Sequence, residues 1–218
     1  MMKRILVELS DTRRAQSIVS HVTDLAATHL AEVTAVRAVP EVAAAAEPVQ
    51  GIAAAGWVRS LHRQSVVDAR ESMIEVVDNL GRHCQENETP FQIVDRDIES
   101  FDWIVETFQY FDMLVCGTNP SFEDTSLETG SEELIQLVEQ GVRPILAVSD
   151  QYRPIQRVLV ALSGDGDSAR TFKQFVQLGV CPNAVVEIVS CGDEDSSPRI
   201  LADSLSYCRR YGIEPEQK

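Results

Sequence analysis

Short apolar runs alternate with longer amphipathic segments along the first two thirds of the chain. The runs have the length and β-branched content of buried strands. There are five of them: Arg4–Ser10, Glu32–Val39, Phe91–Asp95, Met113–Thr118 and Pro144–Val148. Apolar residues recur at helical spacing in the segments between them. These predicted helices cover Ala15–Leu30, Trp57–Glu86, Ser100–Phe111 and Ser131–Gln140. Strands that alternate with helices predict a parallel sheet with right-handed crossovers.

The same pattern then starts again. Arg157–Ser163 repeats the character of Arg4–Ser10, and a helix, a strand and a second helix follow it. We place these three elements at Thr171–Leu178, Ala184–Cys191 and Ser197–Tyr211. The sequence therefore predicts two α/β domains, residues 1–150 and 151–218. The first is a doubly wound five-stranded parallel sheet with helices on both faces, and the second is a partial copy.

The second copy stops early, because Lys218 falls where its third strand should begin. The sequence leaves open whether this polypeptide is a fragment of a longer tandem protein. The strand Val158–Leu162 would then have an open edge. We expect residues 156–218 to be less stable than residues 3–149, or to borrow contacts from a partner.

The segment Met113–Ser131 has the most informative spacing. An apolar strand ends at Gly117, a polar loop of about a dozen residues containing Pro120 follows, and Gly130-Ser131 opens an amphipathic helix. A strand, a loop and a helix start place free N–H groups and the positive end of a helix dipole at one point. In a parallel α/β sheet, ligands bind at that point.

This spacing resembles the Gly-x2-Gly-x9-Gly-Ser/Thr signature of the universal stress protein family. The resemblance implies an adenine nucleotide alpha hydrolase-like, Rossmann-like fold, tandem units, and ATP or AMP with Mg²⁺ as the ligand. It also implies that the backbone of Gly117, Thr118, Gly130 and Ser131 would hold the nucleotide. Two positions depart from the family pattern, because Pro120 replaces a loop glycine and Ser10 replaces the aspartate that ends the first strand.

Charge argues against tight phosphate binding at this loop. The formal net charge of −15 makes nucleic acid or an anionic membrane surface an unfavourable main partner. Residues 97–142 contain eleven acidic residues and no lysine or arginine. Glu132 and Glu133 stand in the first turn of the predicted helix, where they satisfy the helix dipole themselves.

Two further segments have alternative interpretations. Ser163–Ser168, Ser-Gly-Asp-Gly-Asp-Ser, resembles the pyrophosphate loop of ATP pyrophosphatases, although Asp165 stands in place of its second glycine. The other interpretation is a polar turn that caps a helix. For Asp11-Thr12 we likewise expect helix capping. The four histidines form no pair at metal-ligand spacing.

Composition is that of an ordinary globular protein, with 44% hydrophobic and 24% charged residues. No apolar run approaches the roughly 20 residues of a membrane helix. The N-terminus enters a strand pattern directly and has no signal-peptide architecture. Five cysteines without C-x-x-C spacing suggest reduced thiols, buried as small apolar side chains, in a cytoplasmic protein.

Three functional hypotheses follow. The first is a non-enzymatic stress-response or regulatory protein without a tightly bound cofactor, whose first domain has a degenerate nucleotide site. The second is an ATP- or AMP-binding universal stress protein, and the third is an ATP pyrophosphatase-type enzyme. In the family that the sequence resembles, fifth strands pair across a two-fold axis. We therefore expect a homodimer through the edge strand Pro144–Val148.

Overall fold

The computed structural model describes residues 1–9, 13–38, 73–96, 101–118, 130–140, 143–191 and 195–217. The chain divides into two compact units. The larger unit runs from Lys3 to Tyr152, and the smaller unit comprises Arg153–Lys218 together with Met1–Met2. In the described part of the chain, no helix is both long enough and apolar enough to cross a membrane.

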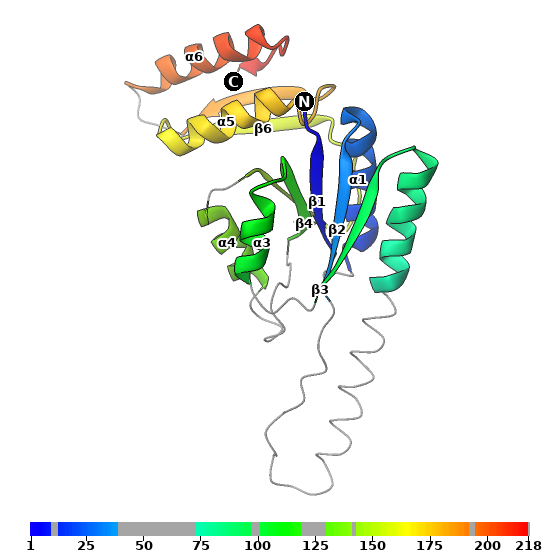
Figure 1. Cartoon of the computed structure of the whole chain (residues 1–218). Coiled ribbons are helices and arrows are strands. Elements are labelled where there is room, and N and C mark those ends of the chain that lie inside the picture. Colours follow the sequence, from blue (N-terminus) through cyan, green and yellow to red (C-terminus); the bar gives the residue numbers. More distant parts are fainter. Residues whose placement is uncertain are drawn as a thin grey trace, which may run out of the picture. The chain divides into compact units, whose positions relative to one another are not determined.

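The larger unit contains a five-stranded parallel sheet with the strand order β3-β2-β1-β4-β5 (Figure 1). Its strands are β1 Arg4–Glu8, β2 Glu32–Ala38, β3 Phe91–Arg96, β4 Met113–Gly117 and β5 Ile145–Val148. The doubly wound fold predicted from the sequence is confirmed. All five predicted strands are present with small shifts at their ends, and β5 lies at one edge of the sheet.

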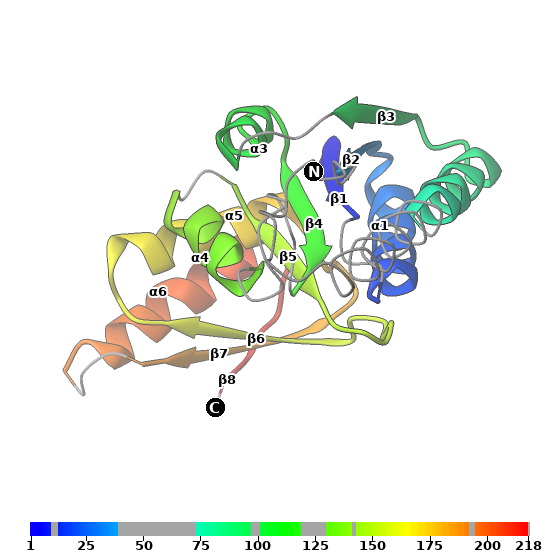
Figure 2. The ribbon, with the colours of Figure 1, turned by 90° about the horizontal axis from the view of Figure 1, so that it is seen from below.

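Helices cover both faces of this sheet. They are α1 Ala15–His29, a helix over residues 73–86, α3 Phe101–Phe108 and α4 Gly130–Gln140. Figures 1 and 2 show α1 and the helix over 73–86 on one face, with α3 and α4 on the other. The first part of the helix predicted over Trp57–Glu86 lies outside the described residues.

Helix α1 begins at Ala15, as predicted, and Arg14 occupies its N-cap position without a side-chain cap hydrogen bond. Asp11-Thr12, which we expected to cap this helix, lies outside the described residues. The first turn carries no acidic residue. The helix is instead held by its apolar face, because Ile18, Val19 and Val22 are at most 1% exposed.

The neighbouring strands β1 and β4 lie at the centre of the core. Ile5, Leu6 and Val7 of β1 are completely buried, as expected for a parallel strand covered on both faces. Asp112 fixes the start of β1 beside β4, because its carboxylate accepts hydrogen bonds from the backbone N–H groups of Lys3 at 2.7 Å and Arg4 at 3.0 Å. These hydrogen bonds and the parallel pairing of β1 with β4 hold the two strands side by side. Their carboxyl ends therefore lie at the same edge of the sheet.

The smaller unit contains a three-stranded parallel sheet with the order β6-β7-β8. Its elements are β6 Arg157–Leu162, α5 Gly166–Leu178, β7 Val185–Ser190, α6 Ser197–Arg210 and β8 Glu216–Gln217. The strand order follows the chain, as it does for β1, β2 and β3. Residues of both helices and both long strands share one apolar cluster: Leu162, Phe172, Val176, Val186, Ile188, Leu205 and Cys208.

Two predictions for this unit were wrong in detail. The first helix starts at Gly166, five residues before the predicted Thr171. The third strand begins at Glu216, so a short β8 already pairs with β7 before Lys218. The polar sequence around Asp167 hid the first turn of α5, because it has no apolar periodicity to mark it.

The equivalent first strands of the two sheets differ in burial. Leu6 in the middle of β1 is 0% exposed, whereas Leu159 in the middle of β6 is 64% exposed. β1 pairs with both β2 and β4, while β6 pairs only with β7 within the described residues. The open edge expected for Val158–Leu162 is therefore present in the described part of the smaller unit.

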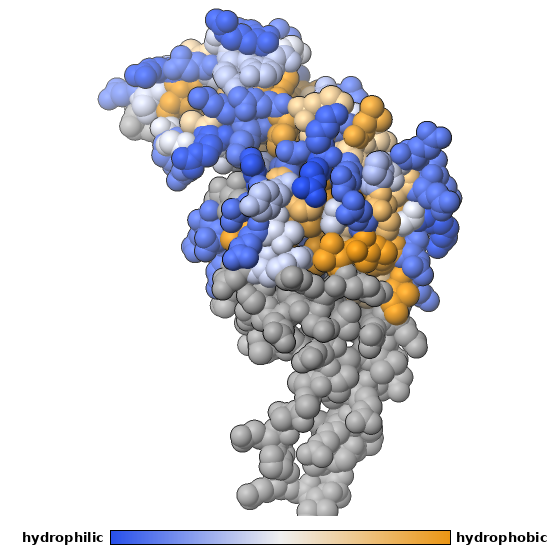
Figure 3. Space-filling view, viewed as in Figure 1, coloured by the Kyte–Doolittle hydropathy of each residue, from blue (hydrophilic) through white to orange (hydrophobic). Residues whose placement is uncertain are grey.

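Much of the coloured surface in Figure 3 is hydrophilic, and an apolar patch lies beside β3, whose Ile93 is 45% exposed.

All five cysteines are free thiols. Cys84, Cys116 and Cys208 are buried, as expected. Cys191 is exposed, so the prediction that it would be buried was wrong. Burial raises the pKa of the Cys84 thiol to about 11.

Candidate functional site

The predicted nucleotide loop of the larger unit is bounded by a strand and a helix, as the sequence indicates. β4 ends at Gly117, which pairs with Val148 of β5, and the exposed Thr118 follows it. α4 begins at Gly130, so Gly130 and Ser131 occupy its first turn. Ser10 and Pro120 lie outside the described residues. The structure thus gives the two ends of the loop and leaves the binding role of these residues a hypothesis.

The first turn of α4 is acidic. Glu132 and Glu133 lie two and three residues after its first residue, Gly130. A negative charge there is favourable for the helix, because the N-terminal N–H groups carry partial positive charge. The same negative charge would repel a phosphate at this end of the helix.

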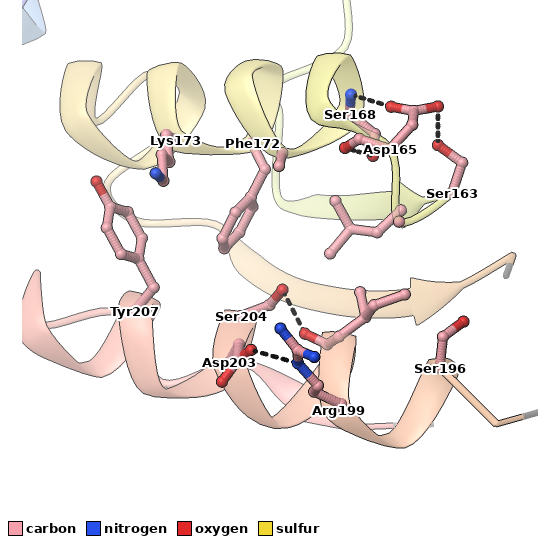
Figure 4. Close-up of a pocket in the computed structure, with 14 residues that line it drawn as sticks. Ser163, Asp165, Ser168, Phe172, Lys173, Ser196, Arg199, Asp203, Ser204 and Tyr207 are labelled. Atoms are coloured by element: carbon pink, nitrogen blue, oxygen red, sulfur yellow. Dashed lines mark hydrogen bonds and ion pairs between the residues drawn. The ribbon is translucent and has the colours of Figure 1, made fainter.

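A second candidate site lies in the smaller unit, between α5 and α6 (Figure 4). It is a pocket of about 790 Å³ that begins at the carboxyl end of β6 and runs along the two helices. Its position follows from the local sequence: β6 ends at the buried Leu162, and Gly164, with φ +87°, turns the chain into α5. We name this pocket the α5–α6 groove.

The upper wall of this groove contains the segment that resembles a pyrophosphate loop. Asp165 is the N-cap of α5, and its carboxylate accepts hydrogen bonds from the Ser168 N–H and the Ser163 hydroxyl, both at 2.7 Å. These hydrogen bonds, that from the Ser168 backbone first, lower the pKa of Asp165 below its ordinary value. A carboxylate of the chain therefore occupies the helix N-terminus, and the segment is the capping turn of the alternative interpretation.

Aromatic side chains form the floor and the far end of the groove. Phe172 of α5 is 6% exposed, and its ring lies 5.8 Å from that of Tyr207 on α6. The Tyr207 ring in turn lies 5.1 Å from that of Tyr211. Gln177 donates a hydrogen bond to the Tyr207 hydroxyl at 2.9 Å, which donates onward to the Tyr211 hydroxyl at 3.4 Å. The hydrogen bond to Tyr211 is the main cause that raises the pKa of Tyr207 above its ordinary value.

Two cationic side chains from opposite helices point into the groove (Figure 4). Arg199 of α6 pairs with Asp203 one turn later, at 3.7 Å, and both side chains are largely exposed. Lys173 of α5 makes no ion pair with any residue in the described part of the chain. The groove thus combines an apolar floor with one uncompensated positive charge.

Sequence reasoning singled out Ser163–Ser168, which forms one wall of this groove, but it missed Lys173, Arg199 and Tyr207. The only signal was Lys173 itself, one of three lysines in a chain of net charge −15, standing next to Phe172 in an amphipathic helix. Arg199 and Tyr207 belong to another helix, so they line the same groove as Lys173 only because of the tertiary fold. No group of three or more His, Cys, Asp or Glu side chains among the described residues could hold a metal ion.

Comparison with solved structures identifies relatives of the fold. A universal stress protein from Archaeoglobus fulgidus DSM 4304 superposes with a TM-score of 0.63 and 12% sequence identity, over 98% of this chain and 76% of that chain. A universal stress protein from Archaeoglobus fulgidus in complex with dAMP gives a TM-score of 0.39 and 14% identity, over 68% of this chain and 98% of that chain. No protein-family model matches the sequence, and no curated protein does. The chain therefore has the Rossmann-like α/β fold of the universal stress proteins.

Proposed function

We propose that this chain is a tandem universal stress protein that acts as a cytoplasmic regulatory protein rather than as an enzyme. In this proposal the nucleotide site of the larger unit is degenerate. The observation that carries it is the acidic first turn of α4, where Glu132 and Glu133 stand at the helix end that would face a phosphate.

The departures in sequence point the same way. Ser10 has no charge with which to hold a ribose, and Pro120 removes one backbone donor from the loop. Losing one hydrogen bond to a charged group costs about 1.5–3 kcal/mol. Two such losses weaken binding by a factor on the order of a hundred or more, at about 1.4 kcal/mol per tenfold. Repulsion from Glu132 and Glu133 adds to this, most strongly at low salt.

A restoration experiment tests the degenerate site. The variant Ser10→Asp, Pro120→Gly, Glu132→Val replaces the three departures by residues that suit a nucleotide site. We expect it to bind Mg-ATP at least about tenfold more tightly than the wild-type chain in calorimetry, because it regains a charged anchor and a donor. Equal and tight binding by both proteins would refute the proposal.

A second candidate function is ATP or AMP binding, with Mg²⁺, by the backbone of Gly117, Thr118, Gly130 and Ser131. It is favoured by one observation, the presence of a strand end at Gly117 and a helix start at Gly130 on either side of the loop. Adenine nucleotide that stays bound through purification and is released on denaturation would support this candidate over the first.

We also propose that the chain forms a homodimer through β5. This strand lies at the edge of its sheet, next to β4, and Ile145 and Leu146 are only half-buried. An apolar edge strand exposes unpaired backbone groups that a second copy can satisfy. Light scattering at tens of micromolar should give the mass of a dimer, and a monomer mass would contradict the proposal.

A further inference from the structure

The α5–α6 groove has the size and lining of a small-molecule site. Its volume of about 790 Å³ lies within the roughly 300–1,000 Å³ of typical ligand pockets. Leu162 and Phe172 form a buried apolar base, and Ile200 and Tyr207 of α6 close it from the other side. A flat apolar body can pack against such a surface and gain both area burial and aromatic contact.

The charged side chains of the groove indicate which charge a ligand should carry. Asp165 is engaged by the N-terminus of α5, and Asp203 by Arg199, so neither acid is available to a ligand. Two cations line the groove. Arg199 pairs with Asp203, whereas Lys173 on α5 (Figure 4) forms no ion pair within the described part of the chain. A cation beside an apolar floor favours a ligand that combines one negative charge with an apolar body.

The number of charges narrows the ligand class. A doubly charged phosphate group would find only one uncompensated cation, Lys173, among the described residues of this groove. The helix N-terminus that often binds phosphate is already filled by Asp165. A single carboxylate needs only one cation, Lys173.

We propose that the α5–α6 groove binds a small aromatic carboxylate, whose ring packs on Phe172 and Tyr207 and whose carboxylate pairs with Lys173. The site belongs to the smaller unit. It does not depend on whether the larger unit binds nucleotide.

The test uses the full chain and a matched pair of probes, 2-naphthoate and the neutral 2-naphthamide, in calorimetric titrations. The two probes share a ring system and differ in charge. We expect 2-naphthoate to bind about fivefold more tightly, which corresponds to an exposed ion pair of about 1 kcal/mol. Lys173→Met, which keeps the length of the side chain, should weaken 2-naphthoate binding to the level of 2-naphthamide and leave 2-naphthamide binding unchanged.

Arg170→Met is the control, because Arg170 lies one turn earlier on α5, pairs with Asp167 at 3.0 Å and does not line the groove. It should leave both affinities unchanged. Amide chemical shifts in the wild-type chain should change around Phe172 and Ile200 when 2-naphthoate is added. Equal affinity for the two probes, an unchanged affinity in Lys173→Met, or shifts confined to other parts of the chain would each overturn the proposal.

Discussion

Gly164, in the turn between β6 and α5, has no room for a side chain beside Ile200 of α6. A Cβ atom added to Gly164 would lie 2.6 Å from the Cδ1 atom of Ile200, and the glycine has φ +87°. Only glycine adopts this backbone conformation without strain. Gly164 and Ile200 both line the α5–α6 groove, so this part of the groove depends on a glycine at position 164.

Gly164→Ala should therefore destabilise the smaller unit. A non-glycine residue in such a conformation costs about 1–3 kcal/mol. The Cδ1 atom of Ile200 also has to move, which costs little because it is the end of a flexible side chain. Chemical denaturation followed by far-UV circular dichroism measures the effect. The matched control is Gly166→Ala, two residues later, where a Cβ meets nothing within 4 Å. This control should leave the stability unchanged or raise it slightly, because alanine favours a helix over glycine. Equal effects of the two substitutions would contradict this role of Gly164.

The hydrogen-bonded carboxylate of Asp165 should make the stability of the smaller unit depend on pH. Its hydrogen bonds from Ser168 and Ser163 hold its pKa below the ordinary value of 3.8. A group with a lowered folded-state pKa stabilises the fold above its unfolded-state pKa, and this contribution is lost as the pH falls through the folded-state value. The thermal midpoint of the smaller unit should thus fall as the pH drops below about 3.8.

Asp165→Asn separates the charge from the cap. Asparagine caps helices about as well as aspartate but does not ionise in this range. The variant should keep most of the stability at neutral pH and lose the part of the acid dependence that comes from Asp165. An acid transition identical in the two proteins would show that the Asp165 carboxylate makes no measurable contribution.

Residues near β6 should exchange their amide hydrogens faster than those of β1. Leu159 is 64% exposed and β6 pairs with one strand in the described part of the chain, whereas β1 is buried between two. Fewer buried contacts lower the free energy of local opening. Hydrogen exchange of Val158–Leu162 and Ile5–Leu9, measured in one sample, makes the comparison. Equal protection of the two strands would contradict this prediction.

The sequence predicts the larger fold well because its strands are apolar on both faces. Val7 and Val115 are fully buried and belong to runs that only a doubly covered parallel sheet explains. The start of α5 was missed for the opposite reason. Gly166 and Asp167 carry no apolar pattern, and the helix begins there because Asp165 caps it. Local hydrogen bonding decides such ends, and hydrophobic periodicity does not report it.

The candidate sites show the same limit. Gly117 and Gly130 could be placed from spacing, because a strand and a helix bound their loop in sequence. The α5–α6 groove could not be predicted, because Lys173 and Arg199 lie on different helices and line one groove only through the packing of both helices on β6 and β7. A pocket between two crossover helices depends on how far apart the helices sit, and no local pattern encodes that distance.

Calorimetric titration of the full chain with Mg-ATP, at moderate salt, tests the central claim most directly. Amide chemical shifts recorded in parallel identify the residues that respond. With Ser10 and Pro120 in place of an acid and a glycine, and Glu132 and Glu133 in the first turn of α4, the account predicts a dissociation constant no tighter than submillimolar. Low-micromolar binding that shifts the amides of Gly117, Thr118 and Gly130 would contradict it.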